Sequence, residues 1–263
     1  MGILTWGVVP PIALLIYIYA LDKVEHEPPA LVAKALLFGC LSVILAIILE
    51  VIGGGVLDAI LNPGSTIYSL LYFFIVVAGS EEFSKRLAMK KAVWNNPEFN
   101  YMFDAVLYCV AAALGFALVE NIEYMLMFGE GVALGRLIPV HTICGVFMGV
   151  YLGSSKLLER AGNYSAAKRA SAYSLLIPIL IHGAYDFCVS GENNTLAIMA
   201  LLGVLVLTVI AFRRVHYVAK TDRPLFAGAS VQAPPQVDMR AASQHPYNGQ
   251  SLNDQDQQNS YWQ

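Results

Sequence analysis

The chain has 263 residues, of which 57% are hydrophobic and only 13% are charged, and its formal net charge at pH 7 is −3. Soluble domains carry about 25% charged residues, so this composition excludes an ordinary soluble protein and indicates a protein embedded in the lipid bilayer. Nothing in the charge balance points to a nucleic-acid partner, and none is predicted.

Apolar segments long enough to cross a membrane recur along the chain. A membrane-spanning helix needs about 20 mostly apolar residues. We predict seven such helices, at 4–20, 33–53, 66–89, 104–122, 135–154, 171–190 and 195–213. The predicted fold is therefore an all-α polytopic bundle of about seven transmembrane helices, occupying residues 1–215.

The basic residues predict the orientation of this bundle. Lysine and arginine are enriched in cytoplasmic loops. If the chain crosses the membrane seven times, fifteen of its 16 lysines and arginines lie on the same side of the membrane. Only Arg136 falls on the other side. We therefore predict that the N-terminus lies outside and the C-terminus in the cytoplasm.

The last part of the chain has a different composition. From about Phe226 it is dominated by Gln, Asn, Ser, Asp and Pro. Such a segment cannot bury enough apolar surface to fold. Residues 216–263 are accordingly predicted to form a disordered, polar cytoplasmic tail.

Two adjacent carboxylates, Glu81 and Glu82, follow the apolar run of the third predicted helix. Ionisable groups inside a membrane helix cost about 2.5–3.5 kcal/mol each on insertion scales and mark functional sites. Lys85 is four residues after Glu81, so the two can pair on one helix face. Two carboxylates this close in a low dielectric should not ionise independently, which suits general acid–base catalysis. The alternative is a charged cap at the cytoplasmic end of a short helix.

The fourth and fifth predicted helices each contribute one polar residue. Glu120 comes sixteen residues into the fourth helix, where an interfacial glutamate is the alternative interpretation. His141 stands at the head of a stripe of glycines spaced by four, at 145, 149 and 153. Such a stripe allows close helix packing, so a packing histidine is the alternative to a functional one.

The sixth predicted helix contains His182 and Asp186, which share a helix face because they are four residues apart. A carboxylate that accepts a hydrogen bond from an imidazole fixes the tautomer of the ring and raises its basicity. Since four different helices contribute a carboxylate or an imidazole to the membrane interior, we infer one shared polar cavity. Its predicted residues are Glu81, Glu82, Glu120, His141, His182 and Asp186.

Three functions are compatible with such a cavity. A carboxylate beside imidazoles can activate water for hydrolysis of a peptide bond. Chains of Asp, Glu and His also relay protons or bind cations in transporters. Transporters commonly show inverted repeats, and none is visible here, which favours hydrolysis. A non-catalytic scaffold that binds the membrane helix of another protein is the third alternative.

The chain contains EEFSK at 81–85, FALVE at 116–120, His141 and HGAYD at 182–186, with Asp104 at the start of the fourth predicted helix. In order and spacing, these motifs resemble those of the PrsW family of intramembrane proteases. The resemblance covers about residues 15–215. The family is similar to the superfamily of CAAX prenyl proteases and bacteriocin-processing enzymes.

This chain departs from the superfamily pattern at two positions. It has Glu120 where the motif FxxxH places histidine, and Asp186 where the motif HxxxN places asparagine. Both variants are associated with the PrsW branch. The resemblance implies that Glu81 and Glu82 are the catalytic glutamates and that His182 is the essential histidine, with Glu120 and His141 at further motif positions.

The resemblance also implies the reaction and its partner. It implies site-1 cleavage of a single-span membrane protein, such as an anti-sigma factor, during stress signalling in the bacterial cell membrane. It leaves open whether a glutamate-activated water or a metal drives the reaction. Glutamate and histidine are suitable zinc ligands, although the chain has no HExxH motif. If a metal is used, zinc is the candidate ion, with Glu120, His141 and His182 as candidate ligands.

Overall fold

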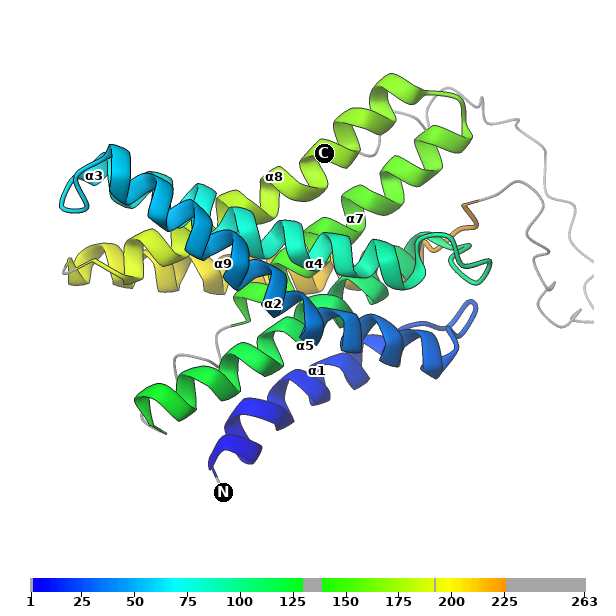
Figure 1. Cartoon of the computed structure of the whole chain (residues 1–263). Helices are drawn as coiled ribbons and strands as arrows, with labels where there is room; N and C mark the ends of the chain where they lie inside the picture. Colours follow the sequence, from blue (N-terminus) through cyan, green and yellow to red (C-terminus); the bar gives the residue numbers. More distant parts are fainter. Residues whose placement is uncertain (1, 130–138, 192, 226–263) are drawn as a thin grey trace, which may run out of the picture. The chain divides into compact units, whose positions relative to one another are not determined.

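The computed structural model describes residues 2–129, 139–191 and 193–225. All of the elements it contains in these ranges are helices. In chain order they are η1 (Ile3–Val8), α1 (Val9–Tyr19), α2 (Pro29–Ile60), α3 (Thr66–Leu71), η2 (Tyr72–Val77), α4 (Ala78–Val93), α5 (Met102–Phe128), α7 (Val140–Arg160), α8 (Tyr164–Val189) and α9 (Asn194–Lys220). Figure 1 shows α8 running back beside α7 after a short turn.

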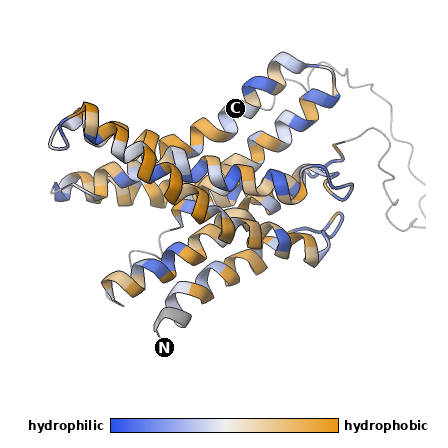
Figure 2. Cartoon of the chain, viewed as in Figure 1, coloured by the Kyte–Doolittle hydropathy of each residue, from blue (hydrophilic) through white to orange (hydrophobic). Residues whose placement is uncertain are grey.

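The structure confirms an all-α, multi-pass membrane architecture. Five of the described helices are long and apolar enough to cross a bilayer: Pro29–Ile60, Thr66–Val93, Met102–Phe128, Tyr164–Val189 and Asn194–Lys220. Figure 2 shows hydrophobic residues along most of these helices and hydrophilic residues gathered where α7 and α8 meet. The count of seven membrane helices and the orientation of the termini stay predictions.

Two sequence predictions concern residues outside the described ranges. The predicted fifth helix begins at 135, whereas description resumes at Pro139 and α7 begins at Val140. The predicted tail lies largely in 226–263, which is likewise outside these ranges. The last described helix continues to Lys220, five residues beyond the predicted domain boundary, and Leu225 is buried.

Helix α5 forms the centre of the bundle. Its most apolar stretch is 89% buried, compared with 11–28% for the other four membrane helices. The exposed faces of those four carry large hydrophobic side chains, as expected of surfaces that contact lipid. Helix α5 packs against both α2 and α7, so the site that these helices share is built on the most buried element.

Glycines bring α5 close to its neighbours. A Cβ atom on Gly39 of α2 would lie 2.1 Å from the carbonyl oxygen of Ala112. A Cβ on Gly115 of α5 would lie 2.0 Å from the carbonyl oxygen of Leu36. No side chain fits at either position, so backbone packs directly on backbone, as small residues permit in membrane helices.

The third membrane helix is longer than its apolar run suggests. It extends without interruption from Thr66 to Val93, and its segment Tyr72–Val77 is a π-helix. Glu81 and Glu82 therefore lie near the middle of the helix rather than at a cytoplasmic cap. Such π-segments occur frequently at functional sites, and this one lies directly before the two carboxylates.

A second buried polar cluster lies around the start of α5. Asp104 accepts hydrogen bonds from the backbone N–H groups of Asn100 (2.8 Å) and Tyr101 (2.6 Å) and so caps the helix. The hydroxyl of Tyr108 donates to the carboxyl of Glu27, which precedes α2. Burial raises the pKa of Glu27 to about 7. These hydrogen bonds connect the segment before α2 to the N-terminal part of α5.

The contact between α2 and α5 gives a stability test with a control on the same helix. Gly39→Ala should destabilise the protein by about 1–3 kcal/mol, because the added methyl group overpacks the contact with Ala112. Gly55→Ala meets nothing within 4 Å and should be neutral or stabilising by up to about 1 kcal/mol, since alanine is the better helix former. Both free energies of unfolding can be measured by SDS titration in mixed micelles. Equal stability of the two variants would show that the helices are not packed this closely.

Candidate functional site

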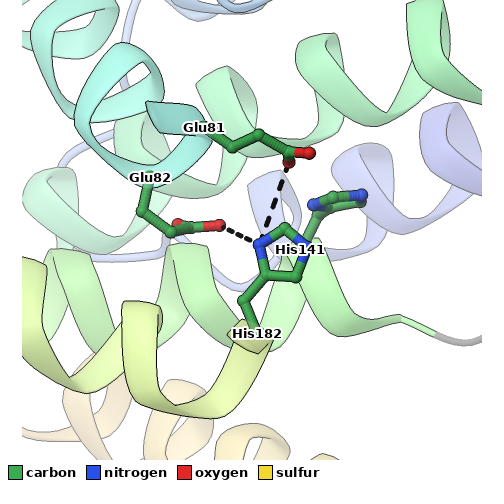
Figure 3. A group of neighbouring side chains, drawn as sticks. All are labelled: Glu81, Glu82, His141 and His182. Carbon is green, nitrogen blue, oxygen red and sulfur yellow. Dashed lines mark hydrogen bonds and ion pairs between the residues drawn. The ribbon is translucent and has the colours of Figure 1, made fainter. Parts of the chain in front are cut away.

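The structure brings all six predicted site residues together from four helices. Glu81 and Glu82 come from α4, Glu120 from α5, His141 from α7, and His182 and Asp186 from α8. Figure 3 shows the carboxylates of Glu81 and Glu82 pointing toward the rings of His141 and His182. The inference of one shared polar site therefore agrees with the geometry, while the role of each residue stays a prediction.

Lys85 lies at the centre of the group. Its Nζ donates to Oε2 of Glu81 (2.9 Å), to Oε1 of Glu82 (2.8 Å) and to Nδ1 of His141 (2.9 Å). An ammonium group has three protons, so all of them are used. The same nitrogen lies 4.1 Å from the centre of the Phe116 ring, where a cation is attracted to the aromatic face. The side chain of Lys85 is only 1% exposed.

His182 lies between two carboxylates. Its Nδ1 is 3.0 Å from Oε1 of Glu82, and its Nε2 is 3.2 Å from Oδ2 of Asp186. The contact with Asp186 is the pair predicted from the spacing of four residues. Because both ring nitrogens face acceptors, the arrangement suits an imidazolium, in which both nitrogens donate.

His141 makes one accepting and one donating contact. Its Nδ1 accepts the hydrogen bond from Lys85, and its Nε2 lies 2.5 Å from Oε2 of Glu120. A neutral ring with its proton on Nε2 satisfies both contacts, so the network assigns this tautomer. The rings of His141 and His182 meet edge to face, with centroids 5.1 Å apart.

Local packing explains how α7 and α8 reach the site. A Cβ atom on Gly149 of α7 would lie 2.5 Å from the Cα atom of Val106 on α5. A Cβ atom on Gly183 of α8 would lie 2.8 Å from the ring of Phe74 in the π-helical segment. The predicted glycine stripe thus serves packing, and the histidine at its head still belongs to the polar group.

A cavity of about 840 Å³ opens beside the group. It is lined by residues of α1, α2, η2, α4, α5, α7 and α8. Glu81, His141 and His182 are among its lining residues, whereas Glu82 is fully buried behind the cavity wall. The two adjacent carboxylates therefore have different access to water and to a ligand.

Sequence reasoning did not identify every carboxylate of this cavity. Glu50 of α2 lines it together with Glu81 and Glu120. Glu50 is a lone carboxylate within the second predicted helix, 33–53, and belongs to no motif. The general rule that ionisable residues inside membrane helices are functional candidates was the available signal.

The donor atoms of the site fit a divalent metal ion. One ligand atom from each of Glu81, Glu82, His141 and His182 can be chosen so that all four lie within 4.8 Å of one another. Two carboxylates and two imidazoles are a suitable donor set for zinc, and Oε2 of Glu82 is buried without a hydrogen-bond partner among the described residues. An ion at this point would have to displace the ammonium of Lys85 from three of the four groups.

This group differs from the ligand set predicted from the sequence. Glu120 is not one of the four converging residues, and its carboxylate contacts the other nitrogen of His141 instead. Such a carboxylate orients the ring and raises its basicity. The metal-ligand roles of Glu120, His141 and His182 stay predictions.

Comparison with known proteins places the chain among membrane proteases. Residues 27–214 match the family model described as "PrsW family intramembrane metalloprotease". The chain is 31% identical over 225 residues to Protease PrsW of Halalkalibacterium halodurans, which covers 84% of this chain and 99% of that protein. It is 31% identical over 226 residues to Protease PrsW of Geobacillus kaustophilus (85% and 95%) and 30% identical over 206 residues to that of Bacillus subtilis (73% and 85%). No solved structure matches the chain.

The central position of Lys85 predicts a large effect of its removal. Lys85→Met should destabilise the protein by about 3–5 kcal/mol, because it leaves buried carboxylates without their cation. The triple variant with Glu81→Gln and Glu82→Gln should recover much of this loss, since it also removes the charges. The control Lys34→Met, at an exposed position on α2, should change stability by no more than about 0.5 kcal/mol. SDS titration in mixed micelles measures all three, and equal losses for the two lysines would contradict the described network.

Proposed function

This chain belongs to the PrsW family of intramembrane metalloproteases, and we propose that it hydrolyses a peptide bond of a single-span membrane protein within the bilayer. The observation that carries the proposal is the different placement of the two glutamates. Glu81 lies at the cavity wall, and Glu82 is fully buried behind it. Lys85 holds both carboxylates.

The geometry supports distinct roles for these residues. Glu81 accepts a proton from a water molecule in the cavity, and the resulting hydroxide attacks the substrate carbonyl carbon. The imidazolium of His182, which lines the cavity, stabilises the oxyanion that forms by its positive charge. The proton on Glu81 then passes to the leaving amine as the C–N bond breaks. Glu82 and Asp186 position His182, while Glu120 positions His141.

A metal ion would be held among Glu81, Glu82, His141 and His182, the four residues whose ligand atoms converge. A catalytic zinc ion keeps one position for water, so three of these four residues would hold it while it supplies Lewis-acid activation of the water and of the carbonyl group. Lys85 would then be released from three contacts, so this chain's lysine and the ion compete for the same donors.

The substrate and topology belong to the same proposal. The chain is a multi-pass membrane protein with a cavity of about 840 Å³ beside the polar group, where we place the substrate segment. We propose a seven-helix topology with the N-terminus outside and a single-span substrate such as an anti-sigma factor. Membership of a protease family favours this reading over the transport and scaffold alternatives.

Loss of any central group should abolish proteolysis. Glu81→Gln, Glu82→Gln and His182→Ala should each lower kcat/KM by about 100-fold or more. They remove, in that order, the general base, the carboxylate that positions His182, and the group that stabilises the oxyanion. The control Glu98→Gln changes an exposed residue outside the membrane helices and should retain activity. Cleavage of a reconstituted single-span test protein in liposomes gives the rates. Full activity of all three variants would overturn the protease proposal.

A separate experiment addresses the metal. Protein purified without chelator should contain about one zinc ion per chain by elemental analysis, as expected for a four-donor site. Lys85→Met should hold zinc at least as tightly, because the competing ammonium is gone. Cleavage should survive removal of zinc by a chelator, because Glu81 is the base in the proposed reaction. Loss of cleavage on chelation, restored by added zinc, would instead assign the activation of water to the metal.

A further inference from the structure

Glu50 occupies a particular place on helix α2. The face of α2 that packs inside the bundle carries Gly39, Val43 and Ala46, and Glu50 follows Ala46 by four residues on the same face. Ala46 belongs to a small cluster with Phe116 of α5, whose ring lies beneath the ammonium of Lys85. Glu50 therefore lies one turn from the wall of the polar site.

A second contact of α2 lies just beyond Glu50. A Cβ atom on Gly53 would lie 3.1 Å from both methyl carbons of Val76, which belongs to the π-helical segment before Glu81. Glu50 thus falls between two contacts, one with α5 and one with η2. Between these two contacts, the half-buried Glu50 lines the cavity.

The carboxyl group of Glu50 has no hydrogen-bond or ion-pair partner among the described residues. This distinguishes it from Glu81, Glu82, Glu120 and Asp186, each of which contacts a lysine or a histidine. A carboxyl group in an apolar membrane environment is costly without a partner. Among the described residues that line the cavity, none is a lysine or an arginine. The described part of the lining therefore supplies no basic side chain to pair with Glu50.

We propose that Glu50 is a specificity-determining residue that binds a basic side chain, lysine or arginine, of the substrate segment in the cavity. The inference rests on the proposed proteolysis, since it takes the cavity as the place where a peptide segment binds. Glu50 is near enough to interact electrostatically with Glu81 and His182, but it shares no hydrogen bond or ion pair with them, so we assign it to selecting the peptide rather than to transferring protons. A basic residue near the cleaved bond would place its charge against Glu50 while the bond lies at Glu81.

Peptide binding tests the inference apart from catalysis. The full chain carrying Glu82→Gln, which is not expected to cleave, is placed in nanodiscs of zwitterionic lipid. Three fluorescent Ala/Leu peptides are titrated against it, identical except for a central lysine, norleucine or glutamate. The lysine peptide should bind about tenfold more tightly than the norleucine peptide, equivalent to about 1.4 kcal/mol. The wild-type chain is assayed in parallel for cleavage of the same peptides.

Variants at position 50 should change the ratio of affinities. With Glu50→Gln, the lysine and norleucine peptides should bind about equally tightly. With Glu50→Lys, the glutamate peptide should bind more tightly than the lysine peptide. Such an inversion cannot result from unfolding. Asp58→Asn is the matched control, because Asp58 lies exposed on the same helix and is not among the residues that line the cavity. It should leave the ratio unchanged.

The remaining outcomes separate the two proposals. Equal binding of all three peptides, or a lysine preference that survives Glu50→Gln, would overturn the role of Glu50. Loss of the preference in Glu123→Gln instead would assign it to Glu123, another carboxylate of the lining. A lysine preference that depends on Glu50, with no cleavage of any peptide by the wild-type chain, would support the binding site and count against proteolysis.

Discussion

The buried ammonium of Lys85 is the interaction on which the rest of the site depends. It contacts two carboxylates of its own helix and one imidazole of α7, in a place where water does not compensate unpaired charge. A buried ion pair contributes little net stability but is costly to break. Lys85 therefore fixes the positions of Glu81, Glu82 and His141 relative to one another. Glu82 in turn positions His182, because its carboxylate contacts the ring of that histidine.

This polar group forms only because the surrounding helices pack very closely. Gly39 and Gly115 let α2 approach α5, and Gly149 lets α7 approach it from another direction. Side chains at these positions would clash with the neighbouring backbone and push the helices apart. The glycines and the ionisable residues thus depend on one another. The glycines allow the helix backbones to pack closely, and the close packing allows ionisable side chains of different helices to form hydrogen bonds.

The helical membrane fold was predictable from the sequence, and so were the six polar residues that the structure brings together, because both predictions follow from local rules; the roles of the six stay predictions. Apolar length marks most of the helices, and spacing of four predicted the pairs Glu81–Lys85 and His182–Asp186. The contacts of Lys85 with His141 and of Glu120 with His141 join different helices, and no spacing rule reaches across helices. Glu50 escaped notice for a similar reason, since its importance comes from the cavity and not from any motif. The predicted helix at 66–89 already placed Glu81 inside the membrane, and the structure extends this helix to Val93.

A crystal structure of the protein grown from a lipidic phase tests the central claim most directly. We expect the carboxylates of Glu81 and Glu82 and the rings of His141 and His182 to converge on one centre. Lys85 Nζ should lie within about 3.2 Å of both carboxylates, unless a bound ion takes its place among the same donors. The claim would be contradicted if the glutamates faced lipid or the aqueous phase, separated from both histidines by more than a water-bridged contact.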